Sequence, residues 1–241
     1  MSDAATQEAT PQAPASLWED FIDIFYAPRE VFARRQNGKF GLVLLIVTLL
    51  TTLLFFAMQG PLGDAFAAEM QRAMQRSGGA APQMTPEQAA GARRMGAIFG
   101  TLAVAVGYPI GICLIGLVLW GLGKMFDFAS TAAMAILIVT YAQFPRVAVS
   151  VVSLLEGILL NPATLAETSV GPARFLDPRT TQPFLMAMLM RMDVFYIWST
   201  VLIAIGIHVL GKVPKAQSYL LAVLVWVVGA IPPLLGGMMA R

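Results

Sequence analysis

Long runs of uncharged apolar residues are the feature that most limits what this chain can fold into. Residues 40–59 contain no charged side chain, and four further blocks of similar character follow. A helix needs roughly 20 apolar residues to cross a bilayer, where its backbone must satisfy its own hydrogen bonds. The sequence therefore predicts an all-α, polytopic membrane helix bundle with five transmembrane helices, at about 40–59, 95–122, 130–158, 192–210 and 218–239.

Composition supports the same class of protein. Of the 241 residues, 57% are hydrophobic and 12% are charged, whereas a soluble domain carries about 25% charged residues. The net charge of +2 comes from cations at segment ends, without the concentrated basic face that a nucleic-acid binder needs. Membrane lipids and other membrane proteins are therefore the expected partners, and nucleic acid is not.

The chain before the first span divides into two parts. Residues 1–15 hold too few large apolar side chains to pack, so we expect a disordered tail. Residues 16–38 predict an amphipathic helix, which Ser16 and Glu19 begin with the spacing of a capping box. This helix either lies at the membrane interface, with its cations near anionic lipid, or packs against the spans. The candidate lipid or partner contacts are Arg29, Arg34, Arg35 and Lys39.

Small residues and a proline predict how the central spans pack. Gly96 and Gly100 are four residues apart, as are Gly107 and Gly111, and such pairs allow helix backbones to approach closely. We expect this packing within one chain rather than between copies. Pro145 lies in the middle of the third block, where the missing N–H should kink the helix.

Arg146 is the first candidate for a functional polar residue. It follows Pro145 inside an apolar block, and a charge at that depth costs at least about 2.5–3.5 kcal/mol on insertion scales. It either forms a site for an anionic lipid or an internal switch, or it reaches the surface because the span is shifted.

Glu156, Arg191 and Asp193 form a second candidate group. Glu156 lies near the end of the third block, and the other two residues begin the fourth. Antiparallel spans would bring all three to one side of the membrane, where a structural ion pair is expected. A proton or ion relay is the alternative, but it would need further acids deeper in the bundle, which the sequence lacks.

The remaining reactive residues predict no metal site, cofactor or catalytic centre. His208 is the only histidine, and a zinc site needs three or four ligands. Cys113 is alone in an apolar block. Methionine pairs one turn apart are ordinary gap fillers on apolar faces. No nucleotide-binding loop, serine elbow or zinc-protease motif occurs, so the chain is not expected to be an enzyme.

Three stretches together resemble the Yip family of Ypt- or Rab-GTPase-interacting membrane proteins. They are Phe25-Tyr-Ala-Pro-Arg-Glu-Val-Phe32, then Thr140-Tyr-Ala-Gln-Phe-Pro145, and last Trp198 to Gly206 with Lys215-Ala216 and Trp226. The resemblance covers about residues 17–239. It implies five helical spans, a cytoplasmic N-terminus and a C-terminus on the opposite side.

The resemblance implies less about function than about fold. The family's eukaryotic members are linked to Rab GTPases and vesicle traffic, and they show an Asp-Leu-Tyr-Gly-Pro-type element ahead of the first span. This sequence lacks that element, which speaks against GTPase binding, and it looks more like the bacterial branch. Arg146 also departs from the family's apolar continuation after the proline. A bacterial cytoplasmic membrane is the expected location.

Two hypotheses for function follow. The first is a non-enzymatic membrane organiser that binds partner proteins or lipid. The second is a small transporter or channel subunit that uses Arg146 with Glu156, Arg191 and Asp193. The two differ in whether Arg146 faces a water-accessible cavity through the bilayer. Charge alone gives little orientation, because seven cations would lie on each side; the four just before the first span favour an N-terminus inside.

Overall fold

The computed structural model describes residues 16–76 and 85–239, so the predicted tail at 1–15 lies outside the described residues. Within these ranges the chain is helical, without strands, and five helices are long and apolar enough to cross a membrane. The predicted five-span helix bundle is confirmed. Two short helices precede it: α1 (Leu17–Asp23) and α2 (Pro28–Arg34).

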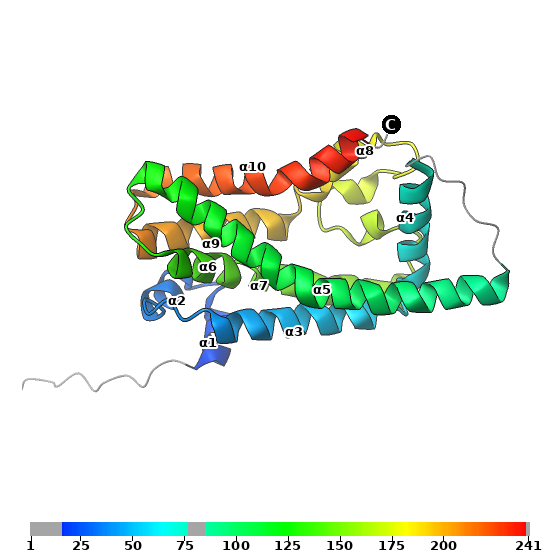
Figure 1. The fold of residues 1–241 in the computed structure, drawn as a ribbon, viewed down its shortest axis with the longest axis horizontal. Coiled ribbons are helices and arrows are strands. Elements are labelled where there is room, and N and C mark those ends of the chain that lie inside the picture. Colours follow the sequence, from blue (N-terminus) through cyan, green and yellow to red (C-terminus); the bar gives the residue numbers. More distant parts are fainter. Residues whose placement is uncertain (1–15, 77–84, 240–241) are drawn as a thin grey trace, which may run out of the picture.

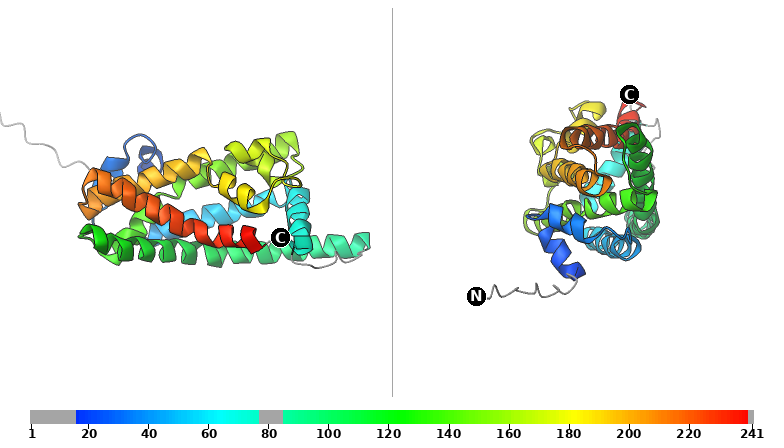
Figure 2. Two further views of the ribbon diagram at one scale, coloured as in Figure 1. Left: turned by 90° about the horizontal axis from the view of Figure 1, so that it is seen from above. Right: turned by 90° about the vertical axis from the view of Figure 1, so that its left-hand side faces the viewer.

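The spans run up and down along one axis (Figure 1), which Figure 2 (right) shows end on. The first two crossings are α3 (Gly41–Met58) and α5 (Pro86–Gly123), and the short turn η1 (Lys124–Phe126) follows α5. The third crossing consists of α6 (Ala132–Tyr141) and α7 (Phe144–Leu160), and the fourth is α9 (Val194–Gly211). The last crossing is α10 (Lys215–Met239). Shorter elements join them: α4 (Gly63–Arg76), η2 (Leu165–Thr168), η3 (Pro172–Phe175) and α8 (Pro183–Met190).

The two ends of the bundle carry different short helices. Helices α1 and α2 lie at one end, and α4 lies crosswise at the other, near α8 (Figure 1). Helix α5 has 38 residues and is therefore about 57 Å long at 1.5 Å per residue. Since a bilayer core is about 30 Å thick, its first turns lie beyond the bilayer. These turns begin at Thr85, which forms a capping box with Gln88.

The third apolar block is broken rather than merely kinked. Helix α6 ends at Tyr141 and α7 begins at Phe144, which places Pro145 in the first turn of α7. Proline has no N–H to bond the carbonyl four residues earlier, here that of Tyr141, and its ring clashes with that carbonyl. The break is therefore stronger than the predicted kink, and it leaves Gln143 and Arg146 beside the gap between the two helices.

The densest packing surrounds α6. Every residue from Ala135 to Tyr141 is buried. A Cβ on Gly116 of α5 would lie 2.7 Å from the Cα of Ile136, and one on Gly206 of α9 would lie 2.7 Å from Cγ2 of Ile138. Both distances are shorter than any ordinary contact, so glycine is required for α5 and α9 to approach α6 this closely.

Most of the glycines in the two predicted packing pairs do not lie against another helix. A Cβ on Gly96, Gly107 or Gly111 would meet no atom within 4 Å, and only Gly100 lies against a neighbour, the Phe55 ring at 3.4 Å. The prediction of close backbone packing at these pairs is therefore wrong for three of the four. Spacing identified small residues but could not identify which face of α5 meets another helix.

The N-terminal helices pack against the spans. Ile24, Val31 and Phe32 are fully buried in the core, and α2 lies against α9. The capping box of Ser16 and Glu19 is present as predicted. The apolar side of residues 16–38 therefore packs on the protein's own spans, which is one of the two predicted arrangements. A contact of the outer side with lipid headgroups stays a prediction.

Candidate functional site

A pocket of about 290 Å³ lies between α5, the α6–α7 break, α9 and α10. Four of the predicted residues line it: Arg146, Arg191, Gly107 and Gly111. Its polar lining consists of Tyr108, Gln143, Arg146, Arg191, Tyr196 and the hydroxyls of Ser199 and Thr200; the rest is glycine, Trp226 and aliphatic side chains. Two guanidiniums therefore face one cavity, and none of its lining residues is acidic.

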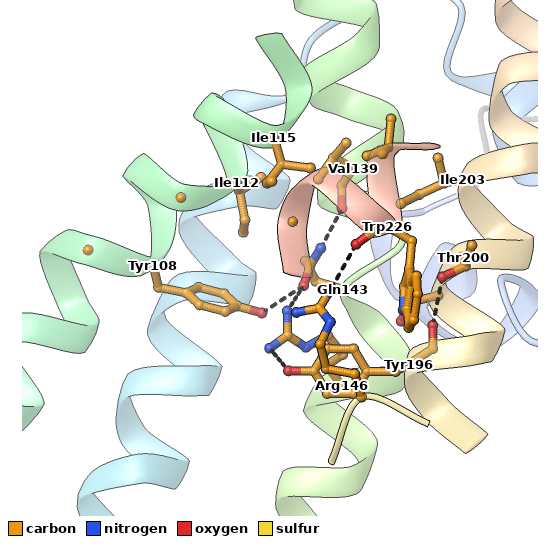
Figure 3. Close-up of a pocket in the computed structure, with 16 residues that line it drawn as sticks. Tyr108, Ile112, Ile115, Val139, Gln143, Arg146, Tyr196, Thr200, Ile203 and Trp226 are labelled. Carbon is orange, nitrogen blue, oxygen red and sulfur yellow. Dashed lines mark hydrogen bonds between the residues drawn. The ribbon is translucent and has the colours of Figure 1, made fainter. Parts of the chain in front are cut away.

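Arg146 has two direct partners, Gln143 just before α7 and Tyr196 of α9. Its Nη1 donates to Oε1 of Gln143 at 3.1 Å, and its Nη2 donates to the hydroxyl of Tyr196 at 2.7 Å. The central carbon of the guanidinium is 4.4 Å from the Tyr196 ring centroid. The Tyr108 hydroxyl reaches the same Gln143 oxygen from α5, at 3.4 Å. Figure 3 shows these four side chains pointing toward one another. Arg146 therefore faces the pocket rather than the surface.

Arg191 enters the pocket from the end of α8. Its Nη2 donates to the backbone carbonyl of Trp226 at 3.2 Å, and its central carbon is 5.4 Å from the Trp226 ring and 5.5 Å from the Tyr196 ring. Its Nε is buried and has no hydrogen-bond partner. Both rings are close enough to the guanidinium for cation–π contacts.

The predicted group of Glu156, Arg191 and Asp193 is divided in the structure. Glu156 forms an ion pair with Arg174 at 2.6 Å. Asp193 is buried and caps α9: its carboxylate accepts from the N–H of Phe195 at 2.8 Å and from that of Val170 at 2.9 Å. The expected ion pair among these three residues is wrong, because nearer partners take both acids. Sequence spacing could not show that the loop before α8 lies against the start of α9, where the Val170 N–H reaches the Asp193 carboxylate.

The N-terminal cations also differ in their surroundings. Arg34 and Arg35 form ion pairs with the buried carboxylate of Asp20, and Arg34 also reaches Asp23 at 2.6 Å. Arg29 and Lys39 are exposed. Of the four candidate contacts, two therefore hold α1 to α2, whereas two face outward.

His208 and Cys113 lie outside the pocket. His208 Nδ1 lies 2.8 Å from the carbonyl oxygen of Val213 at the end of α9. Cys113 is half-buried in α5. Within residues 16–76 and 85–239, no three His, Cys, Asp or Glu side chains are grouped as a metal would require.

Most of the lining was not predicted from the sequence, including the polar or aromatic residues Tyr108, Gln143, Tyr196, Ser199, Thr200 and Trp226. Gln143 could have been found, since an amide inside an apolar block needs a partner as Arg146 does. The aromatic residues carry no such sign, because tyrosine and tryptophan also occur as ordinary packing residues with a large apolar surface.

The bundle, with a cationic pocket between its spans, defines a helical, multi-pass integral membrane protein. A family model for the Yip1 domain matches residues 22–235. The chain therefore belongs to the Yip1-domain family, as the three sequence stretches indicated. Neither a curated protein nor a solved structure matches the chain.

Proposed function

We propose that this protein is a non-enzymatic organiser of the membrane, which binds lipid and partner proteins without transforming them. The pocket is the observation that supports this best. Its lining offers guanidinium and hydroxyl donors, but none of its lining residues is an Asp, Glu, His or Cys. Such a set can hold an acceptor-rich ligand, whereas acid–base or nucleophilic chemistry needs a base within hydrogen-bond reach.

The N-terminal end supplies a surface for partners. Trp18, Ile22 and Tyr26 are each more than half exposed, and the exposed cations Arg29 and Lys39 belong to the same end of the chain. An end that exposes both aromatic and cationic side chains is typical of protein interfaces and of contacts with anionic headgroups. In this proposal the surface faces the cytoplasm of a bacterial cell, and GTPase binding is not part of it.

A transporter or channel subunit is the second candidate, since Arg146 faces a cavity between spans. The acids that this hypothesis required lie elsewhere, however: Glu156 pairs with Arg174, and Asp193 caps α9. A relay through the bundle would need titratable groups in sequence along a path, and none of the residues that line the pocket is an Asp, Glu, His or Cys.

Crosslinking in native membranes tests the organiser proposal. We would crosslink the tagged full chain, identify co-purified proteins by mass spectrometry, and compare the Arg29→Gln/Lys39→Gln variant with Arg94→Gln/Arg179→Gln. Both pairs remove two exposed cations, but at opposite ends of the bundle. The proposal expects a stable partner set that shrinks only in the first variant. No partner set in the parent protein, together with flux of a solute in vesicles, would favour the transporter.

A further inference from the structure

The pocket places two positive charges against one aromatic ring inside the span layer. Arg146 and Arg191 approach the Tyr196 ring, with central carbons 4.4 and 5.5 Å from its centroid. Like charges in a medium of low dielectric repel one another, and no acid lines the cavity. An anion held between the two guanidiniums would remove this repulsion.

The two arginines also have donors to spare. A guanidinium carries five N–H donors, and the hydrogen bonds of Arg146 in the pocket go to Gln143 and Tyr196. Arg191 donates to the Trp226 carbonyl, while its buried Nε has no partner. The planar donor fork of arginine matches the oxygens of phosphate, which accept two parallel hydrogen bonds.

Glycines keep the pocket open and of limited size. A Cβ on Gly107 or Gly111 would meet no atom within 4 Å, so the absent side chains leave free space. The 290 Å³ is many times the roughly 10–15 Å³ that a single water needs. That is room for a phosphate and its nearest atoms, but not for a whole lipid. Gly107 is exposed as well as lining the pocket, which indicates that the cavity reaches the bundle surface beside α5.

We propose that Arg146 and Arg191 together bind a phosphate group, supplied either by a phospholipid headgroup or by phosphate from water. This inference rests on the proposed function in one respect, that the pocket holds its ligand without reacting with it. Gln143 and Tyr196 are positioning residues, because they orient Arg146 toward the cavity.

The test uses the full chain in dodecyl maltoside, a detergent that contains no phosphate. The protein is titrated with phosphatidylglycerol or with inorganic phosphate at constant ionic strength, and the bound fraction is measured by native mass spectrometry. The pocket variants are Arg146→Gln, Arg191→Gln and Gly111→Leu, which fills the space but keeps both charges. Arg93→Gln is the control, because it removes a cation whose side chain is 60% exposed.

The proposal expects binding about tenfold or more weaker in the three pocket variants and unchanged in the control. Saturable binding of phosphatidylglycerol alone identifies the lipid as the source, and binding of inorganic phosphate alone identifies the soluble ion. No binding of either, or equal binding by all variants, overturns the proposal. If an arginine variant does not fold, Gly111→Leu decides. A crosslinked partner set that persists while phosphate binding is absent leaves the organiser function standing.

Discussion

Arg34, Arg35 and Tyr141 surround the buried carboxylate of Asp20. Its Oδ2 accepts from Arg35 Nε at 2.6 Å and from the Tyr141 hydroxyl at 2.8 Å. Arg34 Nη2 lies 3.2 Å from Oδ1, an ionic contact without hydrogen-bond geometry. A buried acid is tolerated only with such partners. One side chain therefore joins α1, α2 and the end of α6.

Asp20→Asn tests this residue directly. The substitution removes the charge that two arginines share, so we expect it to destabilise the protein by about 1–3 kcal/mol. Thermal unfolding in detergent would measure the loss. Asp23→Asn is the matched control, because the Asp23 side chain is 31% exposed and its pair with Arg34 should contribute less than about 1 kcal/mol. Equal effects of the two substitutions would argue against a special role for Asp20.

Helices α5, α6 and α7 show how an element can serve both packing and a site. Gly116 brings α5 against the buried helix α6, whereas Gly107 and Gly111 of the same helix leave space at the pocket. The break before Pro145 then turns Gln143 and Arg146 toward that space. In α5, therefore, one glycine allows close contact with a neighbouring helix, whereas two others leave a cavity open. The neighbouring helices decide which of the two roles a glycine has.

Alanine substitutions separate these two uses. In Gly116→Ala the new Cβ would press on the backbone of Ile136, so we expect a loss of about 1–3 kcal/mol in unfolding free energy, as for other overpacked cores. Gly96→Ala meets no atom within 4 Å and should be neutral or stabilising by up to about 1 kcal/mol, because alanine favours helix. Unfolding in detergent compares the two, and a Gly116→Ala variant as stable as Gly96→Ala would contradict the close approach.

The whole molecule presents two unlike ends. The N-terminal helices, η1 and the turn between α9 and α10 lie at one end, whereas α4 and α8 lie at the other, as Figures 1 and 2 show. Because the number of crossings is odd, the N-terminal helices and the end of α10 also lie at opposite ends of the bundle. The proposed partner surface and the exposed control cations Arg94 and Arg179 are therefore on opposite sides of the bilayer.

Cysteine labelling tests that arrangement. In a Cys113→Ala background, Gln36→Cys and Lys124→Cys should both react with an impermeant maleimide from one side of sealed vesicles. Arg179→Cys should react only from the other side, because one or three crossings separate it from those positions. If the proposed orientation holds, the first two react in inside-out vesicles. Labelling of all three from the same side would contradict the topology.

The sequence by itself determined the class of fold and the positions of its spans, because crossing a bilayer demands long apolar helices whatever their neighbours are. It also determined the capping of α1 and α5 and the interruption at Pro145, since these depend on local backbone chemistry. Part of the site was predictable too: Arg146 is conspicuous as a charge in an apolar block. Tertiary structure alone decided the rest. Arg191 lies with Arg146 instead of Glu156, and Gly116 rather than Gly96 meets a helix. The rotation of each span about its own axis decides which residues become partners. A span that is apolar on every side has no sequence pattern that indicates this rotation.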